Sequence, residues 1–282
     1  MKKINIVLYR PNIPRFNILM SYREVMESLR WGFGELGHDC TVCENTIDHA
    51  ALNIVFGWLV LAQTGQIGSL PYGSILYNLE QLCTHSVEEW ESIADMMKNF
   101  AIWDYSEANV AWWRKMGVNN ARHVRISYSP TLSKLPSVNR DIDFLFYGSP
   151  GAKRLEALGT IAKYRSLVLL GNVWGEQRDS FIARSKIILN PQENNPKKPI
   201  FEIVRVSYLL ANRKAVLCQL PENFDLHIEG DMKNSLILDS AENLSLIADS
   251  LLESPAELDA YAEYCYHVFR MRDVRDVIRD NL

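Results

Sequence analysis

The chain has 282 residues, of which 48% are hydrophobic, and a formal net charge of −4. This length suits one large or two medium domains, and the apolar fraction excludes a wholly disordered chain. Because the charge balance is mildly acidic, we do not expect a protein that binds nucleic acid mainly through charge.

Two further features of the sequence concern the cellular compartment of the protein and its relation to a membrane. The five cysteines are widely scattered without a framework spacing, which is typical of reduced thiols and predicts a cytoplasmic protein. The most apolar run after the N-terminal strand, 52–63, is well below the ~20 residues that a membrane helix needs. The sequence therefore predicts no transmembrane segment.

The first half alternates short β-rich runs with helical patterns. Residues 3–9 read as a strand, and 21–36 as an amphipathic helix that Ser21 and Glu24 would begin as a capping box. The remaining elements expected here are strands at 39–44, 52–57, 74–79, 100–106 and 123–129 and helices at 87–99 and 107–117. Strands that alternate with helices predict parallel pairing in a doubly wound sheet.

A second alternation follows a stretch rich in proline and polar residues. The expected strands are 143–148, 165–171, 185–190, 214–220 and 235–239, and the expected helices are 152–164, 175–184, the run before 212, 241–252 and 255–270. We therefore predict two Rossmann-like α/β domains that face each other across a cleft. Their bounds are 1–130 and 142–265, with a linker at 131–141 and a C-terminal helix at 266–282 that packs back on the first domain.

Ligands bind beyond the carboxyl ends of the strands in open parallel sheets. In YGSPGAKR (147–154), Gly148 and Gly151 would let the backbone approach a ligand, and Lys153 and Arg154 at the helix start would favour an anion. The alternative is an ordinary strand-to-helix turn with a solvated helix start.

The stretch NPKKPIFEIVRVSYLLANRKAVL (195–217) places Lys197 and Lys198 before a helix that is otherwise mostly apolar. Glu202 and Arg205 are spaced to pair across one helical turn, which is one explanation for both charges. The other is a ligand site, in which the helix start with Lys198 binds a diphosphate and Glu202 accepts hydrogen bonds from sugar hydroxyls. Both interpretations stay open at this point.

A catalytic base needs a carboxylate or imidazole near the attacking hydroxyl. Glu80 follows one strand of the first half, His85 lies five residues later, and Asp104 ends the next strand. These three are the candidates. Metal ligands are not expected, because the histidines lack ligand spacing and the Asp141–Ile142–Asp143 motif reads as the start of a strand.

The order of these elements resembles that of GT-B glycosyltransferases. The specific similarity lies in DFLFYGSPGAKR (143–154) and FEIVRVSYLLANRKAVL (201–217). The family has two Rossmann-like domains, an N-terminal one for the acceptor and a C-terminal one for the nucleotide-sugar. The chain departs from it in having only Glu202 where many members have two glutamates eight residues apart, with Leu210 at the second position.

The resemblance implies transfer of a sugar, without a metal or another cofactor, from a UDP- or GDP-linked donor to a hydroxyl of a glycan, lipid or small molecule. The implied donor-binding residues are Gly148, Ser149, Arg154, Asn190, Lys198, Glu202 and Arg205. Three alternatives remain: a sugar-nucleotide epimerase, a catalytically silent nucleotide or glycan binder, and a glycosyltransferase that acts on DNA bases.

Overall fold

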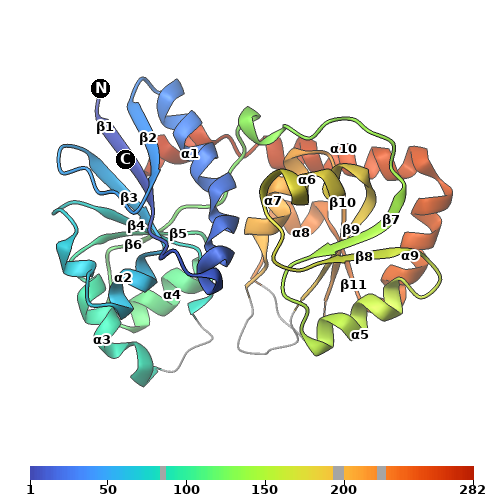
Figure 1. Cartoon of the computed structure of the whole chain (residues 1–282), viewed down its shortest axis with the longest axis horizontal. Helices are drawn as coiled ribbons and strands as arrows, with labels where there is room; N and C mark the ends of the chain where they lie inside the picture. The colour runs from blue at the N-terminus through green and yellow to red at the C-terminus, as the bar shows by residue number, and fades with distance from the viewer. Residues whose placement is uncertain (83–86, 193–199, 221–226) are drawn as a thin grey trace. The chain divides into compact units, whose positions relative to one another are not determined.

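The computed structural model describes residues 1–82, 87–192, 200–220 and 227–282, without the side chains of residues 15 and 87–89 (Figure 1). The chain forms two compact units. The first comprises Met1–Thr131 together with Arg272–Leu282, and the second comprises Leu132–Met271. Each unit is an α/β layer structure with its own parallel sheet and is described separately below.

The first unit is built on a six-stranded parallel sheet in the order β2-β1-β3-β4-β5-β6. Its strands are β1 (Lys3–Leu8), β2 (Asp39–Glu44), β3 (Leu52–Phe56), β4 (Ile75–Asn78), β5 (Ala101–Asp104) and β6 (Ala121–His123). The central strands are buried on both faces, as their almost continuous runs of Ile, Val and Leu require. The chain places β2 on one side of β1 and then places β3 to β6 on the other side. The reversal point of this sheet therefore lies between β1 and β3.

The helices of this unit are α1 (Arg23–Glu35), α2 (Trp58–Gln63), α3 (Val87–Met97), α4 (Glu107–Lys115) and α11 (Val274–Asn281). The predicted capping box at Ser21 and Glu24 is wrong. A 3₁₀ helix, η1 (Pro14–Tyr22), runs directly into α1, so Ser21 is already helical and its hydroxyl donates to the Ile18 carbonyl. The amide groups at the start of α1 therefore need no side-chain cap.

Two other local predictions also need correction. The sequence predicted a strand at 123–129, but β6 ends at His123, and the following residues contribute only an isolated bridge between Tyr128 and Asp273. The apolar run after β3 was too short to be recognised as a helix, yet Gly57 turns the chain with a φ of 72° and α2 follows immediately. This turn becomes important for the site described below.

The end of the chain returns to the first unit. Helix α11 buries Val274, Val277 and Ile278 and packs against α1. Gly32 makes the close approach of the two helices possible, because a Cβ atom there would lie 2.7 Å from Ile278 Cδ1. The helix expected at 255–270 is α10 (Pro255–Arg270), and the expected C-terminal helix begins at Val274 of α11 rather than at residue 266.

The second unit contains a five-stranded parallel sheet in the order β11-β10-β9-β7-β8. Its strands are β7 (Ile142–Tyr147), β8 (Leu167–Leu170), β9 (Ser185–Pro191), β10 (Ala215–Gln219) and β11 (Ile237–Asp239). The chain runs from β7 outward to β8 and then crosses back to β9, so the reversal point lies between β7 and β9. The predicted doubly wound arrangement is confirmed in both units.

Helices α5 (Ala152–Ile161), α6 (Gly175–Arg184), α7 (Ile203–Ala211), α8 (Gly230–Ser235), α9 (Ala241–Glu253) and α10 flank this sheet (Figure 1). Its core includes Phe144, Phe146, Ile187, Leu189 and Leu217, which are fully buried. Residues 133–141 form no regular element. They dock on the end of α7, where Asn212 Oδ1 accepts hydrogen bonds of 2.9 Å from the amides of Lys134 and Leu135.

Within the described residues, no helix is both long enough and apolar enough to cross a bilayer.

Candidate active site

The strongest candidate for a ligand site in the second unit lies at the reversal point of its sheet. The chain leaves β7 at Gly148 on one side of this point, and Asn190 lies near the end of β9 on the other. Connections that diverge from neighbouring parallel strands leave a crevice at their carboxyl ends, where doubly wound proteins bind ligands. The structure thus brings two of the sequence-predicted residues to the same edge.

Gly148 is required by the backbone of the turn between β7 and α5. Its φ of 136° is a conformation that L-residues rarely adopt, and its amide donates a 3.0 Å hydrogen bond to the Leu170 carbonyl. Arg205 of α7 lies directly against it, so a cation covers the exposed backbone of this turn. The next residue, Ser149, is exposed to solvent.

Two arginines and one carboxylate join the predicted residues into a network. Arg154 of α5 is 6% exposed and uses all three of its guanidinium nitrogens: it donates to the carbonyls of Pro191 and Ser149, at 3.1 and 3.0 Å, and to Glu202 Oε1. Arg205 Nη1 donates a 3.1 Å hydrogen bond to Asn190 Oδ1. The two guanidinium groups and the Glu202 carboxylate leave this cluster with an excess of one positive charge.

Glu202 is shared by both arginines, but its two oxygens differ. It stands immediately before α7, and Oε2 lies 2.9 Å from Arg205 Nη2 as an ion pair. The approach is at an angle that makes no hydrogen bond, so this buried oxygen keeps its capacity to accept one. The pairing across one helical turn that the sequence suggested is therefore present, and it leaves a hydrogen-bond acceptor available beside a cationic turn.

An aromatic and cationic stack supports this cluster, and sequence reasoning missed it. The Arg205 guanidinium carbon lies 5.7 Å from the Tyr147 ring centroid, and Arg178 of α6 lies at the same distance from that ring. Tyr208, two residues before Leu210, is buried and donates to Asp179 Oδ2 at 2.8 Å. Nothing in the spacing of Arg178 marked it, because contacts between separate elements leave no periodic signal.

Two sequence-predicted residues, Lys198 of the donor set and His85 of the candidate bases, lie outside the described residues. The roles predicted for Lys198 in donor binding and for His85 as a base remain predictions.

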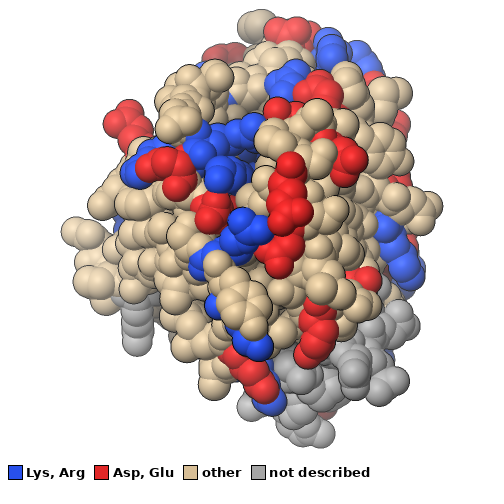
Figure 2. Space-filling model, turned by 90° about the vertical axis from the view of Figure 1, so that its right-hand side faces the viewer, with Lys and Arg blue, Asp and Glu red and all other residues tan. Residues whose placement is uncertain are grey.

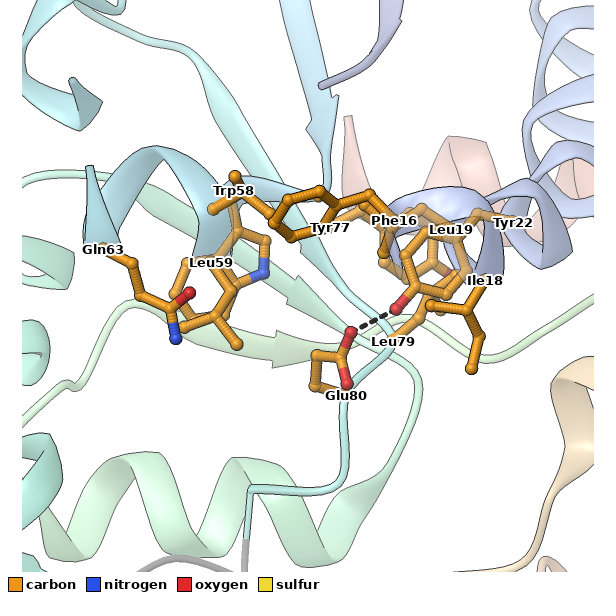
Figure 3. A pocket seen from close by; sticks show the side chains of 12 residues that line it. Phe16, Ile18, Leu19, Tyr22, Trp58, Leu59, Gln63, Tyr77, Leu79 and Glu80 are labelled. Carbon is orange, nitrogen blue, oxygen red and sulfur yellow. Dashed lines mark hydrogen bonds between the residues drawn. The ribbon is translucent and has the colours of Figure 1, made fainter. Parts of the chain in front are cut away.

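The first unit contains a separate pocket at the carboxyl edge of its own sheet (Figure 3). It has a volume of about 250 Å³ and is lined from three directions: by η1, by the β3–α2 turn and by the end of β4. The lining residues are Phe16, Ile18, Leu19, Tyr22, Gly57, Trp58, Leu59, Val60, Gln63, Tyr77, Leu79 and Glu80. The pocket is therefore largely apolar, with a carboxylate on its wall.

Glu80 is positioned by contacts on both its side chain and its main chain. The Tyr22 hydroxyl donates a hydrogen bond to Glu80 Oε1, which Figure 3 shows as a dashed line. Burial is the largest of several causes that raise the pKa of Tyr22 well above its usual value, so this phenol stays a donor at neutral pH. The Glu80 carbonyl accepts from Asn78 Nδ2 at 3.0 Å and from Asn109 Nδ2 at 2.8 Å. The carboxylate is thus fixed at the pocket wall.

Asp104 lies behind Glu80 rather than beside the pocket. It is fully buried and accepts four hydrogen bonds, from the side chains of Asn78, Asn109 and Trp113 and from the Ser106 amide, at 2.7 to 3.0 Å. Burial raises the pKa of this carboxyl to about 7 against the opposing effect of these donors. Because Asn78 and Asn109 bridge Asp104 to the Glu80 main chain, its geometry suits positioning of Glu80.

The charges of the second unit are mostly paired. Asp141 and Asp143 form ion pairs with Arg184 and Lys186, at 2.5 and 2.6 Å, at the start of β7. Figure 2 shows lysines and arginines interleaved with aspartates and glutamates over the face it presents. Among the described residues, no three His, Cys, Asp or Glu side chains gather in a way that could hold a metal ion.

The sequence matches no protein-family model and no curated protein. The structure, in contrast, is similar to several solved glycosyltransferases. Anabaena Alr3699/HepE in complex with UDP-glucose has 10% sequence identity and a TM-score of 0.62, covering 99% of this chain and 98% of that one. An α-glucosyltransferase in complex with UDP and a 13-mer DNA containing a HMU base has 9% identity and a TM-score of 0.64, over 99% and 98% of the two chains.

A third neighbour is AviGT4, a glycosyltransferase involved in avilamycin A biosynthesis. Its identity is 14% and its TM-score 0.63, with 99% of this chain and 96% of that chain covered. The similarity extends over nearly the whole length of each chain. The protein therefore has the GT-B fold, and the fold predicted from the order of its elements is confirmed.

Proposed function

We propose that this protein is a glycosyltransferase that moves a sugar from a nucleoside diphosphate to a hydroxyl group without using a metal ion. The observation that carries the proposal is the cluster of Gly148, Asn190, Glu202 and Arg205 at the reversal point of the second sheet. Two of the structural neighbours are complexes with UDP or UDP-glucose, which supports a UDP-linked donor; a GDP-linked one is the alternative.

In this proposal, each member of the cluster has a separate task toward the donor. Arg205, which lies against the turn at Gly148, supplies the positive charge that the diphosphate meets there. Glu202 Oε2 accepts a hydrogen bond from a sugar hydroxyl, which satisfies its remaining capacity. Arg154 holds Glu202 and the Ser149 carbonyl in place, and Lys198 adds a second cation for the diphosphate.

The acceptor hydroxyl is activated by Glu80. Its carboxylate takes the hydroxyl proton while the acceptor oxygen forms a bond to the anomeric carbon of the sugar. The bond between that carbon and the diphosphate oxygen breaks, and the diphosphate leaves with the electron pair. The positive charges of the donor cluster stabilise this anion in the role that a metal ion has in other transferases.

Turnover of nucleotide-sugars by the purified protein tests the proposal. UDP-, GDP-, ADP-, dTDP- and CMP-linked sugars would each be incubated with the protein, with and without EDTA, and the products identified by mass spectrometry. We expect one donor to be hydrolysed or transferred at an unchanged rate in EDTA. A protein that turns over none of them contradicts the proposal; an epimerised free nucleotide-sugar favours an epimerase, and binding without turnover favours a silent binder.

The same assay separates the proposed base from its neighbours. The Glu80→Gln variant keeps the shape of the side chain but cannot take a proton, so kcat should fall by roughly 10²- to 10⁴-fold while the KM for the donor changes little. An unchanged kcat would remove Glu80 from the mechanism and leave His85 and Asp104 as the candidates.

A further inference from the structure

The pocket beside Glu80 has an unusual balance of surface chemistry for a sugar-binding site. Most of its wall is aromatic or aliphatic, and its polar side-chain groups are the Tyr22–Glu80 pair, the Gln63 amide at the rim, the Tyr77 hydroxyl and the indole N–H of Trp58. The Tyr77 hydroxyl is already used, because it donates a 2.6 Å hydrogen bond to the Val124 carbonyl. The pocket therefore offers a ligand few hydrogen-bonding groups.

The indole N–H of Trp58 is a hydrogen-bond donor that the pocket offers to a ligand. Trp58 is 2% exposed as a whole residue, but its nitrogen is not among the buried polar atoms that lack a partner. Figure 3 shows the indole nitrogen turned into the pocket, on the side of Glu80. A donor that faces an otherwise apolar pocket favours a ligand that carries an acceptor atom at the matching position.

Building on the proposed transferase function, we propose that the pocket binds an acceptor of the phenol class, a flat ring with a hydrocarbon body, one hydroxyl and a second oxygen. The hydroxyl donates to Glu80, the ring packs against the more exposed apolar lining of Ile18 and Leu59, and the second oxygen accepts from the Trp58 N–H. The volume of about 250 Å³ lies just below the ~300 Å³ at which pockets begin to hold drug-sized ligands, which matches one small ring system.

A saccharide fits this pocket poorly. A hexose carries a hydroxyl on almost every carbon atom, and most of these would face Leu19, Leu59, Val60 and Leu79 without a partner. Each hydroxyl buried without a hydrogen bond weakens binding by roughly tenfold. The substrate class that the proposed reaction glycosylates is therefore an apolar alcohol rather than a glycan.

Direct binding of two matched probes tests this inference without any donor. The phenolic probe is 4-methylumbelliferone, which has one hydroxyl and a carbonyl oxygen on a flat ring system, and the saccharide probe is methyl β-glucoside. Isothermal titration should show binding of the first and none of the second. Equal affinities for the two, or binding of the glucoside alone, would overturn the inference.

Two variants locate the binding. Trp58→Phe keeps an aromatic ring and removes the N–H, so it should weaken binding of the phenolic probe by about fivefold. Trp112→Phe is the matched control, because Trp112 belongs to the same aromatic cluster but does not line the pocket. The affinity of Trp112→Phe for the phenolic probe should equal that of the wild type. An equal loss of affinity in Trp58→Phe and Trp112→Phe would contradict the assignment of the Trp58 N–H to ligand binding.

A third variant avoids the buried core altogether. Ile18 is 56% exposed at the pocket, so Ile18→Glu places a charge there at little risk to folding. Its affinity for the phenolic probe should fall about tenfold. If nucleotide-sugars are turned over but the phenolic probe does not bind, the inference of a phenolic acceptor is refuted and the proposed transferase function is not. If the probe binds as described and no nucleotide-sugar is turned over, the proposed function falls and the pocket assignment stands.

Discussion

Arg205 packs so closely against Gly148 that a Cβ atom at position 148 would lie 2.8 Å from Arg205 Nη2. The turn after β7 and the cation on α7 thus form one continuous surface, although 57 positions separate them in the sequence. This contact explains why glycine is needed at 148 for two independent reasons, the positive φ and the lack of space.

Gly148→Ala should therefore damage both stability and donor binding. A side chain there strains the backbone by about 1–2 kcal/mol and pushes Arg205 away from the turn. We expect a lower Tm and a smaller increase in Tm on addition of UDP. Gly159→Ala is the control, because this glycine lies inside α5 with open space around its Cα, and the change should be neutral or slightly stabilising. Similar effects of UDP on both variants would contradict the role of this turn.

Arg154→Ala should be strongly destabilising. The change removes hydrogen bonds to the Pro191 and Ser149 carbonyls and leaves Glu202 without one of its two cations. Breaking a buried ion pair of this kind costs about 3–5 kcal/mol, measurable by urea denaturation. Arg184→Ala, which breaks the exposed pair with Asp141, should cost less than about 1 kcal/mol. Equal costs would show that Arg154 does not hold the cluster together.

Tyr22→Phe should lower kcat. The variant keeps the ring and removes the hydroxyl that donates to Glu80 Oε1, so the carboxylate loses the side-chain contact that holds it at the pocket wall. A base that is less well placed against the acceptor hydroxyl should reduce kcat by roughly tenfold, with little change in the KM for the donor. An unchanged kcat would mean that this hydrogen bond does not position the base.

Lys214→Met should reveal a buried charge in the second unit. Burial, with a smaller effect of Arg140, lowers the pKa of Lys214 to about 8 from its usual 10.5. Between these values the unfolded chain binds the proton and the folded protein does not, so the free energy of unfolding contributed by Lys214 rises with pH. The wild type should gain stability relative to the variant between about pH 8 and 10.5. A constant or falling difference in unfolding free energy between the wild type and Lys214→Met over this pH range would contradict the assigned direction.

The fold could be predicted from the sequence because the strands are nearly continuous runs of Ile, Val and Leu, separated by amphipathic helices. Runs such as 185–190 are buried on both faces, which only a covered parallel sheet allows. The short apolar helix α2 was missed since its six residues continue the pattern of β3 without an interruption other than Gly57. The length and the periodicity of this apolar run could not show where β3 ends and where α2 begins.

The site was predictable only in part. Gly148, Asn190 and Arg205 could be placed at strand ends and helix starts, where the rule for ligand sites in parallel sheets applies. The partners of Glu80 could not be found, because Tyr22 lies 58 positions away and contacts it only through the folding of η1 over the sheet. Asp104 had the right residue type at a strand end, yet its burial becomes visible only once Trp113 and Asn109 fold over it.

The most direct test of the donor site is a calorimetric titration of UDP into the wild type, Arg205→Ala and Arg165→Ala. Arg205 belongs to the proposed diphosphate site, whereas Arg165 pairs with Asp249 away from it. We predict that the wild type and Arg165→Ala bind UDP with equal affinity and that Arg205→Ala binds it at least about tenfold more weakly, as expected for loss of a charge-assisted contact. Equal affinities in all three proteins, or no binding to the wild type, would contradict the account.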